Sequence, residues 1–211
     1  MGKRLESWEK EFKDHKYLII LSVVFLIIAN VLNFIAGMYV EKKGEAAVSD
    51  LILDHIPAID LTFLFVYGFS AIIIIIFLYP LFYKVHELHI AISQFSLLVM
   101  IRSFFVSLTH LKAPVGAIIA TEAPRLYALL DFQNALFFSG HTAIPFLGFL
   151  LFKKEKIGKF FLIATIVMAL VVLFMHVHYS IDVFAALFIT YGTYKVGEWL
   201  FKKVNHDSSK D

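Results

Sequence analysis

Four long stretches without a charged residue constrain the fold of this chain more than any other feature. They cover residues 17–40, 61–83, 132–152 and 160–181, and they are 24, 23, 21 and 22 residues long. A helix needs about 20 apolar residues to cross the hydrocarbon core of a bilayer. Apolar and polar residues do not alternate along these stretches, which disfavours a transmembrane β-barrel. The sequence therefore predicts an all-α, multi-pass membrane protein.

Two shorter apolar stretches extend this prediction to six membrane-spanning helices. Residues 88–101 and 183–194 carry no charge, and each reaches the length of a span if the neighbouring Arg102 or Lys195 extends to the membrane surface. The predicted limits of the six helices are about 17–40, 61–83, 86–108, 134–152, 157–177 and 181–201. The first apolar stretch is longer than the core of a secretory signal, so we expect it to be retained.

The distribution of lysine and arginine predicts the orientation in the membrane. In a six-span topology, 14 of the 19 Lys and Arg residues fall in the two termini and in the second and fourth loops, which share one side. Basic residues accumulate on the cytoplasmic side of membrane proteins. Both termini are therefore predicted to be cytoplasmic, with segments 1–16 and 202–211 flanking a membrane domain of residues 17–201. The chain contains no cysteine, which excludes disulfides and thiolate metal sites.

Four ionisable residues gather on the extracytoplasmic side of this predicted topology. Arg102 lies in the last two turns of the third helix, and His141 lies in the outer part of the fourth. The fifth helix ends near His178, and the sixth begins with Asp182. Ionisable groups inside spans are costly and usually line a functional cavity. A carboxylate four residues after an imidazole can fix its tautomer, which leaves the other ring nitrogen as base or nucleophile. A second imidazole can serve as general acid, and a guanidinium suits phosphate oxygens.

This set of side chains predicts phosphoryl transfer without a metal or another cofactor. Two histidines, a carboxylate and an arginine are sufficient for transfer through a phosphohistidine. The sequence offers no carboxylate cluster of the kind that holds magnesium.

Two motifs carry a resemblance to a known family. Ser-Gly-His-Thr at 139–142 and His-Val-His-Tyr-Ser-Ile-Asp-Val at 176–183 resemble the second and third motifs of the type 2 phosphatidic acid phosphatase superfamily. More narrowly, they resemble its sphingomyelin synthase branch, as do Arg102 and the stretch Asp-Leu-Ile-Leu-Asp-His-Ile-Pro at 50–57. The Lys-x6-Arg-Pro motif and the Ser-Arg pair of the phosphatase branch are not present in the sequence.

The resemblance implies a site on the periplasmic, extracellular or lumenal side. In that site His178 attacks phosphorus, Asp182 orients it, and His141 protonates the departing oxygen. The residues implied to bind the substrate phosphate are Arg102, Ser139 and Gly140. The candidate contacts for the headgroup are His176 and Tyr179.

The predicted partners are membrane lipids, and no nucleic-acid motif is found. The resemblance favours a lipid phosphotransferase, with a phospholipid as donor and a lipid alcohol as acceptor. A lipid phosphate phosphatase, in which water is the acceptor, uses the same residues. A lipid-binding protein without catalysis is the third reading.

Several of these residues also have structural interpretations. Asp182 can cap the sixth helix, Arg102 can reach lipid phosphates, and His176 can sit in the membrane interface. Asn30 and Asn33 of the first helix are interpreted as contacts between helices. In the longest extracytoplasmic loop, residues 115–130 are expected to lie on the membrane surface.

Overall fold

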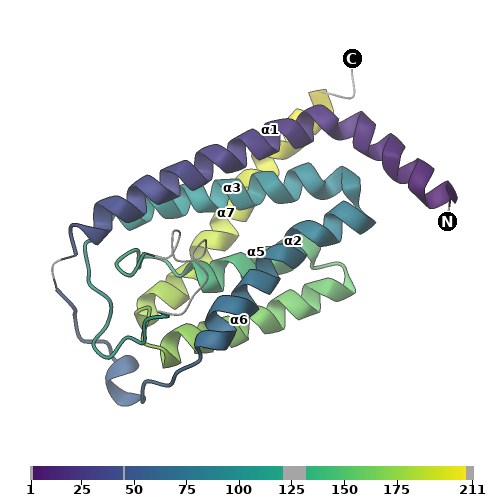
Figure 1. Cartoon of the computed structure of the whole chain (residues 1–211). Coiled ribbons are helices and arrows are strands. Elements are labelled where there is room, and N and C mark those ends of the chain that lie inside the picture. The colour runs from purple at the N-terminus through teal and green to yellow at the C-terminus, as the bar shows by residue number, and fades with distance from the viewer. Residues whose placement is uncertain (1, 45, 121–131, 208–211) are drawn as a thin grey trace.

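The computed structural model describes residues 2–44, 46–120 and 132–207, and it is a bundle of helices (Figure 1). No strand is present in these ranges, and the predicted all-α class is confirmed. The long helices are α1 (Gly2–Glu41), α2 (Phe69–Tyr83), α3 (Val85–Leu108), α5 (Gly140–Phe152), α6 (Lys156–Phe174) and α7 (Ser180–Asp207). The shorter elements are a 3-10 turn, η1 (Leu53–His55), and a π-helical segment, η2 (Leu64–Gly68), that leads directly into α2.

The length and composition of the helices are those of a membrane protein. Four helical segments in the described part of the chain are long and apolar enough to cross a bilayer: Trp8–Glu41, Leu64–Tyr83, Val85–Leu108 and Lys156–Phe174. Helix α5 is apolar but shorter, with 13 residues. Large apolar side chains on the outside of the bundle are exposed, as expected for a surface that faces lipid; Ile27, Ile163 and Phe188 are examples.

Several helix limits differ from the sequence-based expectation, among them the starts of α1 and α5 and the ends of α6 and α7. Helix α1 begins at Gly2, because the segment before the first apolar stretch continues the same helix. Helix α5 begins at Gly140, six residues after the predicted start, because the backbone carbonyls of Ala135 and Phe138 accept hydrogen bonds from Arg102. A side chain from α3 thus satisfies carbonyls that a longer helix would have used internally. Helix α6 ends at Phe174, three residues earlier than predicted.

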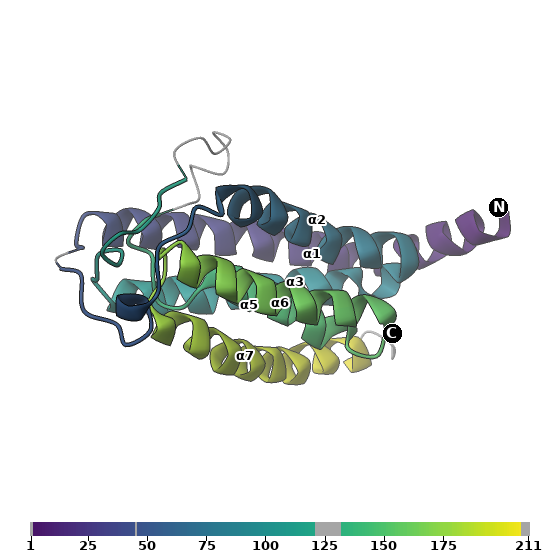
Figure 2. The same cartoon turned by 90° about the horizontal axis from the view of Figure 1, so that it is seen from below.

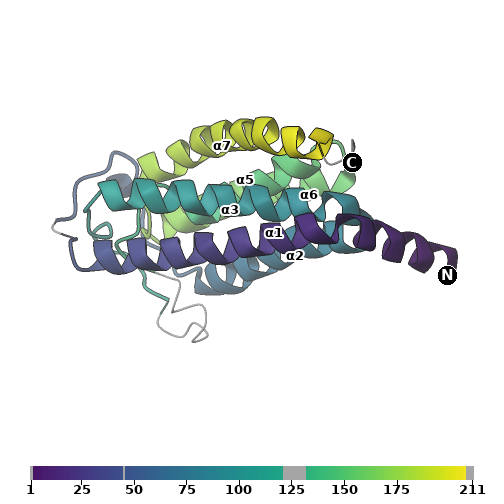
Figure 3. The same ribbon diagram turned by 90° about the horizontal axis from the view of Figure 1, so that it is seen from above.

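The helices pack in two connected groups around a shared core. Helix α3 lies between α1 and α7 (Figure 3), and α5 packs against α6 and α7. The central core combines side chains from α2, α3, α5 and α6, including Ile76, Leu98, Leu147, Phe161 and Met168. Because lipid tails are as apolar as these side chains, close packing rather than exclusion of water holds such helices together. Gly148 allows α5 to approach α6, since a Cβ atom there would lie 2.5 Å from the ring of Phe161.

The two ends of the bundle differ in construction (Figures 1 and 2). At one end, here called the turn end, short turns join α2 to α3 and α5 to α6, and α1 starts and α7 finishes there. The opposite end, here called the loop end, carries residues 42–63, 109–120, 132–139 and 175–179. The predicted surface segment 115–130 lies mostly outside the described residues. Its first part is tied to the α6–α7 turn, because the N–H of Ile118 donates to the carbonyl of Met175 at 2.9 Å.

A polar cluster fastens the turn end. The hydroxyl of Tyr79 and the ammonium of Lys84 both bind the carboxylate of Glu155, and Lys84 also binds Glu87 at 3.1 Å. Burial raises the pKa of Glu155, but the hydrogen bonds from Lys84 and Tyr79 and the charge of Lys84 outweigh this and hold that pKa below its ordinary value. The cluster therefore links the α2–α3 turn to the α5–α6 turn.

Candidate active site

The turn between α6 and α7 brings His178 and Asp182 together. One carboxylate oxygen, Oδ2 of Asp182, lies 3.4 Å from Nδ1 of His178 and accepts the backbone N–H of Tyr179 at 3.0 Å. Both side chains are buried, His178 with 6% and Asp182 with 2% of its surface exposed. Asp182 thus serves both as a cap of α7 and as a partner of His178. Because a carboxylate only accepts hydrogen bonds, Nδ1 carries the proton and Nε2 is left with the lone pair.

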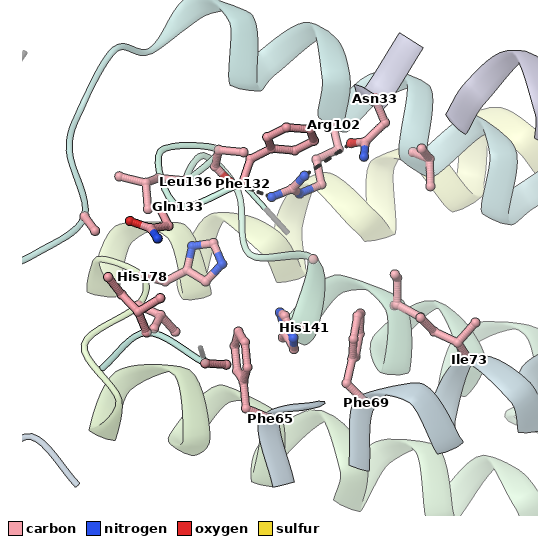
Figure 4. Close-up of a pocket in the computed structure, with 18 of the residues that line it drawn as sticks. Asn33, Phe65, Phe69, Ile73, Arg102, Phe132, Gln133, Leu136, His141 and His178 are labelled. Atoms are coloured by element: carbon pink, nitrogen blue, oxygen red, sulfur yellow. Dashed lines mark hydrogen bonds between the residues drawn. The ribbon is translucent and has the colours of Figure 1, made fainter. Parts of the chain in front are cut away.

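His141 stands in the first turn of α5, between two phenyl rings. Its ring centroid lies 4.0 Å from that of Phe65 and 3.9 Å from that of Phe69 (Figure 4). Both phenyl rings come from the stretch where η2 passes into α2, and π-helical turns of this kind are frequent at functional sites. The start of α5 is tied to α7, because the N–H of Ser139 donates to the carbonyl of Asp182 at 3.2 Å.

The two histidines line one cavity of about 220 Å³. The predicted meeting of side chains from α3, α5 and the α6–α7 turn is thus found in the structure. The polar residues of the lining are Asn30, Asn33, Arg102, Gln133, His141 and His178. Its apolar part includes Phe65, Phe69, Ile73, Phe95, Val99 and Ile144. Figure 4 shows His178, His141 and Arg102 around a common space, with Ile73 further along the bundle.

Arg102 lines this cavity and also holds the segment before α5. Its Nε donates to the carbonyl of Phe138 at 3.0 Å, and a terminal nitrogen donates to that of Ala135 at 2.6 Å. The other terminal nitrogen lies 3.4 Å from the side-chain oxygen of Asn33. Gly140 is adjacent, since a Cβ atom there would lie 3.4 Å from Nε.

Ser139 and Tyr179, which are also predicted site residues, lie near the cavity but do not line it. Ser139 is completely buried, and its hydroxyl accepts a hydrogen bond from Thr142 at 3.4 Å. Tyr179 points into the loop end, where its hydroxyl accepts the N–H of Val48 and donates to the carbonyl of Lys112. Neither is among the described residues that line the cavity.

His176 lies against a separate hollow of about 390 Å³, which Asp50 and Asp54 also line. It has a φ of 56°, and its Nδ1 lies 3.3 Å from the carbonyl oxygen of Val115. The two histidines of the His-Val-His motif therefore face different spaces.

The sequence interpretation missed part of the cavity lining. The interpretation of Asn33 as a contact between helices is confirmed, because its side-chain oxygen on α1 lies 3.4 Å from a terminal nitrogen of Arg102 on α3. Asn30 and Asn33 also line the cavity, which the sequence interpretation does not include. Their spacing of three on an apolar helix places them on one face, which is a signal that a sequence can carry. Phe65 and Phe69 carry no comparable signal, because the chain contains 23 phenylalanines.

Among the described residues, no three His, Cys, Asp or Glu side chains are arranged to hold a metal ion. Comparison of the chain with models of protein families, with curated proteins and with solved structures finds no match.

Proposed function

We propose that this protein is an integral-membrane lipid phosphotransferase, which moves a phosphate or phospho-headgroup from a phospholipid to a lipid alcohol. The observation that carries the proposal is a single cavity lined by two imidazoles, one of them paired with a buried carboxylate, and continued by apolar side chains. The polar part suits a phosphate, and the apolar part suits an acyl chain. The resemblance of residues 139–142 and 176–183 to the sphingomyelin synthase branch supports the same chemistry.

The proposed reaction has two steps. In the first, Nε2 of His178 attacks phosphorus, the bond from phosphorus to the departing alcohol oxygen breaks, and protonated His141 gives its proton to that oxygen. Asp182 stabilises the positive charge that develops on the imidazole of His178. In the second, His141 takes the proton of the acceptor alcohol, whose oxygen attacks phosphorus and displaces Nε2.

Arg102 has two roles in this proposal. Its contacts with the carbonyls of Ala135 and Phe138 fix the chain just before Ser139. Its guanidinium also lines the cavity, where its charge offsets that of the phosphate and of the transition state. A lysine could supply the charge, but it lacks the planar set of donors that reaches several acceptors at once.

The proposed topology has six spans, with both termini in the cytoplasm. The four helices that meet the length and hydropathy of a span are completed by α5 with the uncharged residues before it, and by α7. In this arrangement the loop end, which holds the cavity, faces the periplasm, the exterior or an organelle lumen. The excess of basic residues at the turn end supports that orientation.

Transfer in defined vesicles tests the proposal. The purified protein is reconstituted with a phospholipid labelled in its phosphate and with an unlabelled lipid alcohol, and the products are separated. We expect a new labelled phospholipid, and a loss of at least about 10³-fold in His178→Ala. His86→Ala is the matched control, because His86 lies on α3 at the turn end and is half exposed. Labelled free phosphate without a new lipid would show a phosphatase. Full activity in His178→Ala would refute the assigned nucleophile.

A further inference from the structure

Two carboxylates bind successive backbone N–H groups at the start of α7. Asp182 accepts the N–H of Tyr179 at 3.0 Å. Asp50 accepts the N–H of Ser180 and the hydroxyl of Ser180, both at 2.8 Å and both with Oδ2. The first N–H groups of a helix have no partner within the helix and attract anions. The start of α7 is therefore capped twice, once from within the motif and once from a loop that lies 130 residues earlier.

The loop that supplies Asp50 is itself fixed. The second oxygen, Oδ1 of Asp50, accepts the N–H groups of Ile52 at 2.9 Å and Leu53 at 3.1 Å. Leu53 is buried and packs with Leu136 and Tyr179. The carboxylate thus has four hydrogen-bond donors around it, two from its own turn and two from α7. It reaches α7 from a turn that is held by packing as well as by hydrogen bonds.

We propose that Asp50 is a positioning residue of the candidate active site, which caps α7 and thereby leaves Asp182 available to His178. The inference rests on the proposed function and deepens it. Oδ2 of Asp182 already serves two donors, the N–H of Tyr179 at 3.0 Å and Nδ1 of His178 at 3.4 Å. Without Asp50, the N–H of Ser180 lacks its acceptor, and Asp182 is the carboxylate nearest to it in the chain. A turn of Asp182 toward the helix start lengthens its contact with His178.

Asp50→Asn tests this positioning role, because it removes the charge and one acceptor oxygen of the side chain but keeps its shape. An amide offers one oxygen and one NH2 group. Whichever way it turns, the NH2 group faces backbone N–H groups, either that of Ser180 or those of Ile52 and Leu53 in its own turn. Asp60→Asn is the matched control. Asp60 lies on the same inter-helix segment and is exposed, and its described hydrogen bonds are all local, with the N–H of Thr62 at 2.9 Å and with the side chain of the same residue.

The test measures transfer kinetics and the imidazole of His178 in the same reconstituted protein. Nitrogen NMR of ¹⁵N-histidine-labelled protein reports the proton on Nδ1, and His178→Gln assigns the signal. For Asp50→Asn we expect kcat to fall by about 10-fold or more with little change in KM, as when an outer partner of a functional histidine is removed. We also expect the Nδ1–H signal of His178 to shift toward that of a weaker hydrogen bond. Asp60→Asn should change neither.

The outcomes are distinguishable. Asp50→Asn with wild-type kcat and an unchanged His178 signal overturns the inference, as does an equal loss in Asp60→Asn. An inactive wild-type protein refutes the proposed function, while the NMR signal still tests the positioning. If Asp50→Asn does not fold, Ser180→Ala removes only the hydroxyl contact with Asp50. A smaller shift of the same signal then supports the inference, and no shift overturns it.

Discussion

The imidazole of His141 lies nearly parallel to the phenyl ring of Phe65, with 16° between the planes and 4.0 Å between the centroids. Phe69 lies on the other side of the imidazole (Figure 4). Two aromatic neighbours at this distance restrict rotation of the imidazole, so its ring nitrogens keep a fixed direction within the cavity. A general acid works only when its proton points at the departing atom. The phenyl rings therefore matter for the reaction as well as for packing.

Phe65→Leu is expected to reduce kcat more than it raises KM, because leucine fills much of the volume but does not hold a flat ring in one plane. We expect a loss of about 10-fold in kcat, which is a part of the roughly 10²–10⁴-fold that proton transfer by a positioned side chain contributes. Phe63→Leu is the control, since Phe63 is 73% exposed on the same segment. Equal kinetics in the two variants would show that Phe65 acts only as packing.

Asp182→Asn should abolish most of the activity while the helix start survives. An asparagine can still accept the N–H of Tyr179 with its oxygen, and asparagine is a good helix cap. The same oxygen position also serves Nδ1 of His178, so the amide keeps that contact but loses the charge that would stabilise a positive imidazole on His178. The equivalent substitution lowers kcat by about 10⁴-fold in a comparable triad. The measurement is single-turnover formation of the acid-labile phosphohistidine, with circular dichroism to verify the helix content. Normal phosphohistidine formation would exclude Asp182 from the reaction.

Ile73→Trp should discriminate between donor lipids by the length of their acyl chains. Ile73 lines the apolar part of the cavity, so a larger ring there shortens the space for a chain. We expect KM to rise for long-chain donors and to remain similar for short-chain donors. The neighbouring Ile74 is 54% exposed, and Ile74→Trp is the control. If long- and short-chain donors respond equally to Ile73→Trp, the acyl chain lies elsewhere.

Much of the bundle follows from the sequence, because uncharged runs of about 20 residues have few alternatives to a helix in a membrane. The start of α5 does not follow, because it depends on Arg102 binding the carbonyls of Ala135 and Phe138. These contacts join residues more than 30 positions apart, and local patterns do not encode them.

The candidate site likewise has contacts that the sequence predicts and contacts that it does not. A spacing of four predicts the pair of His178 and Asp182, and the structure has it. The sequence alone does not place Phe65 on His141 or Asp50 on Ser180, because each contact requires loops and helices to meet in three dimensions.

Glu155→Gln should lower stability without lowering activity. The carboxylate joins Tyr79 and Lys84 at the turn end, away from the cavity. Loss of the charge weakens hydrogen bonds that involve charged groups, and we expect a decrease of about 1–2 kcal/mol in the free energy of unfolding. Thermal unfolding in detergent measures the decrease, and Glu9→Gln, at an exposed position on α1, is the control. A fall in kcat at a temperature where the variant is folded would contradict the separation of the two ends.

The contribution of Asp50 to stability should depend on pH with a defined sign. Partial burial raises the pKa of this carboxyl, but hydrogen bonds from the backbone of Leu53, Ser180 and Ile52 and from the Ser180 hydroxyl together hold it below its ordinary value of 3.8. A lowered pKa in the folded state means that the carboxylate stabilises the protein above pH 3.8, and that this contribution is lost as the pH falls through the lower value. The difference in unfolding temperature between the wild type and Asp50→Asn should therefore be constant near neutral pH and shrink below pH 3.8. A difference that persists at lower pH would show that the charge of Asp50 does not hold the loop on α7.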